Sequence, residues 1–258
     1  MQQNARLTEE IADELLKISA MLMTSGANTN RILLILNKFA DLMNVDAQVF
    51  INHKAFIISL THKISGERTT QVRRLPHHGV NFDTISALSR AGFKAEKEKW
   101  DFDKIKQEIV RIQKLKRFPR ILVLTATSLA GAGFCNLFNG DYVSMTVVFV
   151  ATFIGLFVKQ TFDRLKFNPL ICAFTGTLIS GLFAGWVMTF IPEIDPNIAI
   201  ATSVLFIIPG VALINAFTDM IDGYIITGFV RFMSAFLYIT AIALALFIVM
   251  YIFGIQYL

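Results

Sequence analysis

From Phe118 to the C-terminus the sequence is a series of apolar runs, each long enough to cross a lipid bilayer. A spanning helix needs roughly 20 apolar residues, and runs of about this length lie at about 118–138, 142–160, 169–190, 198–217 and 225–253. Of the 24 Lys and Arg residues, 20 lie in residues 1–120 and only 4 follow. Because backbone groups in lipid must be satisfied within the protein, such runs form helices. We therefore predict a membrane protein in which residues 118–258 form a bundle of about five transmembrane helices.

Residues 1–117 have the composition and periodicity of a soluble domain. Apolar residues at helical spacing predict one helix from Thr8 to Met23 and a second from Asn28 or Thr29 to about Met43. Runs rich in Val, Ile and Phe predict three strands within residues 47–74, and two more helices are expected at 81–91 and 102–115. We expect an α+β domain with a small core of its own. It contains neither of the glycine-rich motifs that cradle nucleotide phosphates.

The distribution of positive charge predicts how the chain is oriented. Basic residues cluster at the start of the first apolar run and around the loop after the second, at Lys114, Lys116, Arg117, Arg120, Lys159, Arg164 and Lys166. The loops at 139–141 and 191–196 contain no Lys or Arg. Since Lys and Arg favour the cytoplasmic side, we expect a cytoplasmic N-terminus and, after five spans, a C-terminus outside. A basic run next to a span favours anionic lipid, rather than nucleic acid, as its partner.

A proline–glycine pair interrupts the fourth apolar run. Pro209 lacks a backbone donor and clashes with the preceding helical turn, and Gly210 adds backbone freedom. The pair is expected to break the helix near its middle. Broken helices supply substrate and ion sites in many transporters, whereas a simple kink improves packing only. Both interpretations are open at this point.

Polar residues follow this break at Asn215, Asp219, Asp222 and Arg231. A charge at the centre of a span costs on the order of 3 kcal/mol and is retained where it pairs or faces a cavity. In a substrate or coupling site, the carboxylates would bind an ammonium group or a proton, and Arg231 would bind a carboxylate. In the alternative, both Asp residues lie in a cytoplasmic turn, Arg231 extends to the interface and Asn215 bridges helices.

The connection between the first two helices carries a motif at Gly26, Thr29 and Arg31. Arg31 falls at the start of the second helix, where the helix dipole does not favour a cation. A partner or a ligand would explain its position there. The remaining candidates for acid–base chemistry have no nucleophile or carboxylate placed with them by a motif, and we interpret them as loop or surface residues: His53, His77 and His78.

Small residues within the apolar runs are interpreted as packing residues. Cys135 and Cys172 lie in predicted spans without the spacing of a metal site or a disulfide framework. Gly181 and Gly185 have the spacing that lets helices approach closely in lipid. Packing within one chain is favoured over a dimer face, and a homo-oligomer stays open. The sequence predicts no catalytic residue, metal site or cofactor.

The order and spacing of these residues resemble the threonine/serine exporter family, in particular its N-terminal-domain half. The resemblance covers nearly the whole chain and rests on the early G-A-x-T-x-R element, on a soluble domain before five spans and on a P-G-x4-N-x3-D-x2-D/G-x5-G-x2-R run. The last run is formed by Pro209, Gly210, Asn215, Asp219, Asp222, Gly228 and Arg231. Leu33 stands where the family pattern G-x-x-T-x-R-x-E has a glutamate.

This resemblance implies a subunit of a secondary transporter in a bacterial inner membrane. The family exports small polar metabolites, threonine and serine in some members and a dicarboxylate such as succinate in members split over two chains. The second half is absent here, which implies a smaller membrane partner subunit. Without an ATP-binding motif, the proton gradient or the membrane potential would drive export. Two alternatives are a membrane-anchored signalling or enzymatic protein whose soluble domain is the active part, and an assembly subunit that scaffolds a transporting partner.

Overall fold

The computed structural model describes the backbone of residues 2–52, 55–75, 79–191 and 196–254. It contains two compact units. The first combines Met1–Lys116 with Gly210–Met233, and the second combines Arg117–Pro209 with Ser234–Leu258. The division that we placed between residues 117 and 118 stays a prediction, and the first compact unit includes a later segment of the chain as well.

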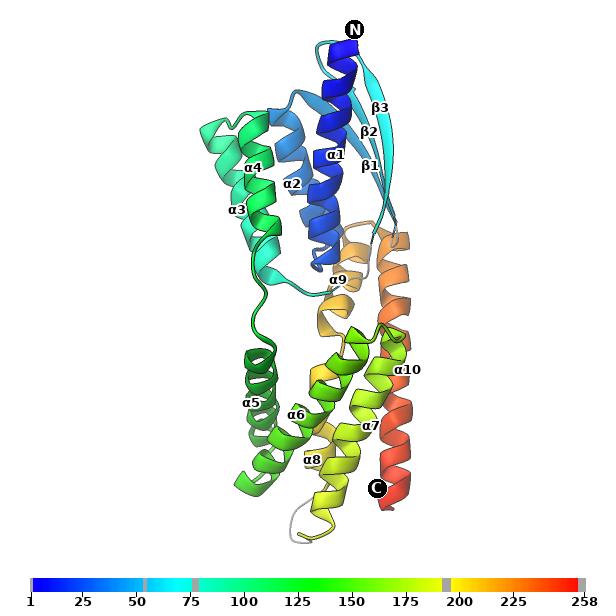
Figure 1. The fold of residues 1–258 in the computed structure, drawn as a ribbon. Helices are drawn as coiled ribbons and strands as arrows, with labels where there is room; N and C mark the ends of the chain where they lie inside the picture. The colour runs from blue at the N-terminus through cyan, green and yellow to red at the C-terminus, as the bar shows by residue number, and fades with distance from the viewer. Residues whose placement is uncertain (1, 53–54, 76–78, 192–195, 255–258) are drawn as a thin grey trace. The chain divides into compact units, whose positions relative to one another are not determined.

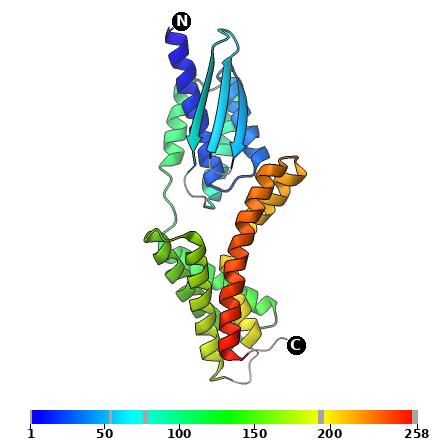
Figure 2. The ribbon, with the colours of Figure 1, turned by 90° about the vertical axis from the view of Figure 1, so that its right-hand side faces the viewer.

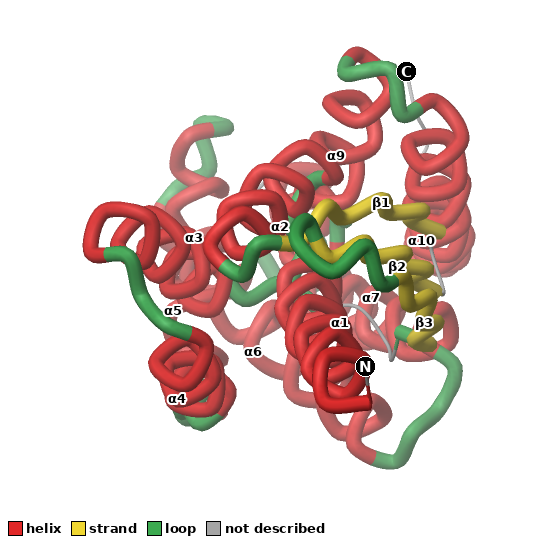
Figure 3. Tube along the Cα trace, turned by 90° about the horizontal axis from the view of Figure 1, so that it is seen from above, coloured by secondary structure: helices red, strands yellow, loops and turns green. Residues whose placement is uncertain are grey.

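The first unit contains a layer of helices packed against one face of a three-stranded sheet (Figure 1). The helices of its N-terminal segment are α1 (Gln2–Thr24), α2 (Thr29–Leu42), α3 (Phe82–Glu98) and α4 (Phe102–Gln113). The antiparallel strands are β1 (Val45–Asn52), β2 (Ala55–His62) and β3 (Arg68–Arg74), in the order β1-β2-β3. Figure 2 shows the sheet in front of these helices, and Figure 3 shows the strands beside α1 and α2.

Side chains alternate between the two faces of this sheet, as the period of a strand requires. Phe56 and Ile58 of β2 point to the helices and are buried. On the opposite face Phe50, Ile57 and Val72 are exposed and lie in register across the three strands. The predicted strands are therefore present at the expected places, with one face in the core.

Helix α3 continues beyond its predicted end. We expected it to stop near Ala91, but the helix runs to Glu98. Gly92 is buried, and a Cβ atom there would lie about 3.5 Å from the side chain of Ile35 and 3.6 Å from that of Phe39. Packing against α2 therefore retains the helix where the intrinsic preference of glycine would end it.

The connection between α1 and α2 is a compact, capped turn. Gly26 has a φ of +90°, and the amide of Ala27 donates to the carbonyl of Leu22 while that of Gly26 donates to Met23. This is the Schellman arrangement, which favours glycine at the left-handed position. The side chain of Asn28 then accepts from the amide of Arg31 and caps α2.

The first unit is completed by helix α9 (Gly210–Ile221) and the first turns of α10 (Ile225–Phe253). A tight turn at Gly223, with φ +90°, connects the two helices. They pack closely at Gly228, where a Cβ atom would lie 2.6 Å from the carbonyl oxygen of Ala216 and 2.6 Å from the side chain of Met220. Glycine is thus required at this contact, which places Arg231 one turn further along α10.

The second unit consists of helices with small residues at their contacts. Its elements are α5 (Arg120–Leu137), α6 (Tyr142–Arg164), α7 (Pro169–Met188), α8 (Pro196–Ser203), the short 3₁₀ helix η1 (Leu205–Ile207) and the rest of α10. The hydroxyls of Thr152 and Ser180 both donate to the carbonyl of Ser203, at 3.1 and 2.8 Å. They satisfy a backbone acceptor at the end of α8, as a broken helix in lipid requires.

Four helices among the described residues are long and apolar enough to cross a membrane: α5, α6, α7 and α10. The segments Pro196–Ile207 and Gly210–Ile221 pass the same test together as one bent pair, which gives up to five spans. The break falls at Ile208 and Pro209, and Ile208 is extended at φ −59° and ψ 125°. The expectation of a helical membrane protein is confirmed, and the helix break that we expected at Pro209 and Gly210 is present.

Candidate functional site

The carboxylate of Asp219 is the centre of a buried polar cluster in the first unit. Asp219 lies on α9 and is fully buried. Its Oδ1 accepts the backbone N–H of Thr29 at 2.8 Å, and its Oδ2 accepts the hydroxyl of the same residue at 3.0 Å. The guanidinium Nε of Arg231 lies 3.3 Å from Oδ2. Donors from α2 and α10 therefore meet the carboxylate on both of its oxygens.

The guanidinium of Arg231 is bound by the end of α1 as well as by Asp219. Its Nη1 donates to the carbonyl of Ala27 at 3.1 Å, and its Nη2 contacts the Sδ of Met23 at 2.9 Å. Arg231 is only 8% exposed. Its side chain does not extend to an interface, which was the alternative that the sequence left open.

Asn215 ties the same two regions together from one turn earlier on α9. Its Nδ2 donates to the carbonyl of Gly26 at 2.7 Å. This amide joins α9 to the α1–α2 connection, so the alternative in which Asn215 serves as a bridge is what the structure shows. We call the group formed by Gly26, Ala27, Thr29, Asn215, Asp219 and Arg231, with Met23, the α1–α2/α9–α10 cluster.

Helix dipoles explain why this ion pair is stable where it lies. Thr29 is the first residue of α2, so its N–H is one of the donors that a helix cannot satisfy itself. A carboxylate is favoured at this positive end, and a cation is favoured near the negative end of a helix, here the C-terminal end of α1. The opposite charges of Asp219 and Arg231 thus meet opposite helix ends, which offsets the cost of burying them.

The other predicted site residues lie apart from this cluster. Asp222 is exposed in the turn after α9. Arg31 is exposed on the first turn of α2, and no described carboxylate lies within 4.0 Å of its guanidinium. Pro209 and Gly210 form the break before α9, and a Cβ atom on Gly210 would have nothing within 4 Å. His53, His77 and His78 lie outside the described residues.

Two contributors to the cluster were missed by sequence reasoning. Nothing in the sequence marks the thioether of Met23 or the carbonyl of Ala27 as a partner of a distant arginine, because neither contact depends on a polar side chain. Gly228 did carry a signal, since it lies three residues before Arg231 in the family pattern. Its role is to let α9 and α10 approach closely, which helical periodicity alone does not reveal.

A multi-helix membrane protein with a compensated charge pair on its candidate spans is typical of transporters, where such pairs mark pathways for substrates or protons. The comparisons with known proteins agree with this class. The family model described as "Putative threonine/serine exporter" matches residues 13–253. The chain therefore belongs to the threonine/serine exporter family.

Two relatives have the same printed description, "Probable succinate transporter subunit YjjP". The protein from Klebsiella aerogenes is 32% identical over 205 residues, covering 77% of this chain and 77% of its own length. The protein from Escherichia coli K12 is 32% identical over 203 residues, covering 77% of this chain and 78% of its own. No solved structure matches the chain.

Proposed function

We propose that this chain is one subunit of a secondary transporter that exports small polar metabolites from the bacterial cytoplasm. The observation that carries the proposal is the buried ion pair of Asp219 and Arg231, bound on one side by Thr29. Family membership favours transport over a membrane-anchored enzyme or signalling protein, and supports a chain without catalytic activity.

The cluster supports a mechanism in which substrate exchanges partners with the ion pair. The carboxylate of a substrate takes the guanidinium of Arg231, and its ammonium group, or a coupling proton, takes the carboxylate of Asp219. Neither charge is left buried and unpaired during such an exchange. An unpaired buried charge would cost several kcal/mol. Pro209 and Gly210 supply the broken helix whose free backbone groups contribute to binding. In this mechanism Asn215 and Thr29 hold the site closed until the exchange occurs.

Two substrate classes fit the proposal to different degrees. An amino acid such as threonine or serine brings one charge of each sign and replaces the ion pair without a net change. A dicarboxylate such as succinate brings two negative charges, and only one of them can pair with Arg231. The names of the two relatives favour the dicarboxylate. Export assays with both classes of substrate discriminate between them.

We further propose that residues 1–117 form a soluble α+β domain in the cytoplasm, with the C-terminus of the chain outside the inner membrane. The relatives are described as subunits, and this supports a second, smaller membrane subunit that supplies the other half of the transporter. A chain of roughly 150 residues with four or five spans, encoded by the neighbouring reading frame, is the partner that we expect.

The test is export from cells that express the chain with this partner. Asp219→Asn and Arg231→Ala are each expected to abolish export while the protein stays in the membrane. Asp222→Asn is the matched control, because it makes the same chemical change three residues away at an exposed position. Wild-type export by both the Asp219 and the Arg231 variants would refute the assignment of the site.

A further inference from the structure

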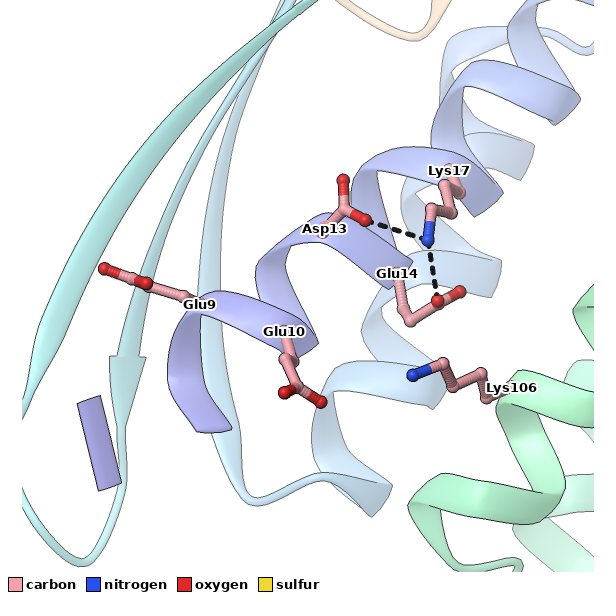
Figure 4. A pocket seen from close by; sticks show the side chains of 6 residues that line it. All are labelled: Glu9, Glu10, Asp13, Glu14, Lys17 and Lys106. Carbon is pink, nitrogen blue, oxygen red and sulfur yellow. Dashed lines mark hydrogen bonds and ion pairs between the residues drawn. The ribbon is translucent and has the colours of Figure 1, made fainter. Parts of the chain in front are cut away.

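A second polar site lies in the N-terminal segment, apart from the α1–α2/α9–α10 cluster. It is a pocket of about 300 Å³ lined by α1 and α4, a volume at the lower end of the range for small-molecule sites. Its lining side chains are Glu9, Glu10, Asp13, Glu14 and Lys17 of α1 and Lys106 of α4 (Figure 4). An acidic helix face alone is commonly a solvated surface, so the individual contacts decide what this pocket does.

Glu14 has a carboxylate oxygen without a partner in this pocket. The residue is only 4% exposed. Its Oε1 accepts a hydrogen bond from Lys17 at 2.8 Å, whereas its Oε2 has no hydrogen-bond partner among the described residues. Since buried polar groups are nearly always paired and a lone buried acceptor is unfavourable, this oxygen indicates a donor that none of the described side chains supplies.

Lys106 presents the opposite charge to the same pocket. Among the side chains that the structure describes, no carboxylate lies within 4.0 Å of its ammonium group, and its Nζ lies 5.9 Å from the ring of Phe102. Figure 4 shows the Lys106 side chain pointing toward the carboxylates of α1. The pocket therefore contains one carboxylate oxygen without a donor and one ammonium group without a described carboxylate partner, and the two lie more than 4.0 Å apart.

Lys17 pairs with the Oε1 of Glu14 and leaves its Oε2 without a donor. Its ammonium group is already bound by Asp13 and Glu14, at 2.8 Å each. The hydrogen bonds that Lys17 donates to these two carboxylates, that to Asp13 first, raise its pKa, so its ammonium group stays charged and bound to them. The unpaired Oε2 of Glu14 and the ammonium of Lys106 are thus left for a ligand.

The two unpaired groups define the chemistry of that ligand. An ammonium group satisfies Glu14, and a carboxylate satisfies Lys106. The described His, Cys, Asp and Glu side chains form no group of three that would hold a metal ion. A diamine would leave Lys106 unpaired, and a dicarboxylate would place a second negative charge among four carboxylates. We propose that this pocket binds a small zwitterion with one ammonium and one carboxylate, such as a free α-amino acid.

This site does not depend on the proposed transport function, because none of its residues belongs to the α1–α2/α9–α10 cluster. Binding is measured by isothermal titration calorimetry on the full chain in lipid nanodiscs, with L-serine, succinate and putrescine as separate ligands. We expect serine to bind and the other two to bind at least about tenfold more weakly, since each lost charge-assisted hydrogen bond is worth a factor of this order.

Substitutions then test the two groups separately. Glu14→Gln and Lys106→Met are each expected to weaken serine binding at least about tenfold. Glu108→Gln and Lys114→Met make the same chemical changes on and just after α4, outside the pocket, and are expected to leave binding unchanged. Lys106 is exposed, so its substitution probes the site even where Glu14→Gln lowers the stability of the chain.

Hydrogen exchange identifies where serine binds. Serine is expected to slow exchange in residues 9–17 and 102–113 of the wild type, and to do so equally in Asp219→Asn. The proposal is overturned by an absence of serine binding, by binding that Glu14→Gln and Lys106→Met leave intact, or by tighter binding of succinate or putrescine. Protection confined to residues 26–31 and 215–231 would place serine in the transport cluster instead, and would also overturn it.

Discussion

The hydroxyl of Thr29 offers the sharpest test of the buried cluster, because one hydrogen bond can be removed while the backbone contact stays. In Thr29→Val the N–H still donates to Oδ1 of Asp219, but the 3.0 Å hydrogen bond to Oδ2 is lost. Hydrogen bonds to charged groups contribute about 1.5–3 kcal/mol. A loss of 1 kcal/mol lowers Tm by about 2–4 °C in a protein of 150–250 residues, so we expect a decrease of about 3–12 °C.

The matched control is Thr29→Ser, which retains the hydroxyl and removes one methyl group. That methyl group is buried, and its loss costs about 0.8 kcal/mol, or about 2–3 °C by the same conversion. Serine is therefore expected to be the less damaging substitution, although valine is closer to threonine in shape. This order distinguishes a hydrogen bond from simple packing.

Tryptophan fluorescence reports on the unit that contains the cluster. The chain has two Trp residues. Trp100 is buried in the first unit, and Trp186 is exposed in the second. In a Trp186→Phe background the thermal transition of Trp100 follows the first unit alone. A Thr29→Val transition within error of the wild type, or a Thr29→Ser transition below that of Thr29→Val, would refute the reasoning.

Three further predictions concern single residues. Gly228→Ala is expected to lower the free energy of unfolding by about 1–3 kcal/mol, because the added methyl group overpacks the α9–α10 contact. Gly210→Ala has open space around it and is expected to be neutral or stabilising by up to about 1 kcal/mol. Equal thermal transitions of Trp100 in the two variants would contradict this prediction. The indole N–H of Trp100 donates to Glu98 at 2.7 Å and is the main cause that lowers the pKa of Glu98 from 4.5. The stabilisation from this hydrogen bond to the Glu98 carboxylate is therefore present above pH 4.5 and lost as pH falls through the lowered pKa. Trp100 emission is accordingly expected to change with pH below pH 4.5 in the wild type and not in Glu98→Gln. The predicted orientation places Asn139 outside the cytoplasm. Asn139→Cys in a cysteine-free background is therefore expected to react with an impermeant maleimide in intact spheroplasts, and reaction only after permeabilisation would contradict this orientation.

Much of the fold was predictable because its causes are local. Lipid requires long apolar helices, and a proline cannot continue a helix. Gly26, which has no side chain, ends α1, and the side chain of Asn28 caps the start of α2. These features depend on a few neighbouring residues. The helix break at Pro209 and the three strands were accordingly expected at the places where the structure has them.

The pairing of the two motifs was not predictable, although all of its polar side chains had been singled out. Thr29 and Asp219 are 190 residues apart, and no pattern in one chain states which distant segments meet. Two of the contacts also end on backbone carbonyls, those of Gly26 and Ala27, and every residue possesses such a group. The sequence suggested that Arg231 binds a partner, but only the fold shows that the end of α1 is part of it.

The contact between Thr29 and Asp219 also sets an order of events during synthesis. At about 5–20 residues per second, the ribosome adds Asp219 about 10–40 s after Thr29, once α5 to α8 have been made. Until then, water or a chaperone must form hydrogen bonds with the carbonyls of Gly26 and Ala27 and with the first amide of α2. Completion of the first unit therefore waits until α9 and the start of α10 have been made. A nascent chain that stalls before α9 leaves this unit unfinished, with those backbone groups still exposed.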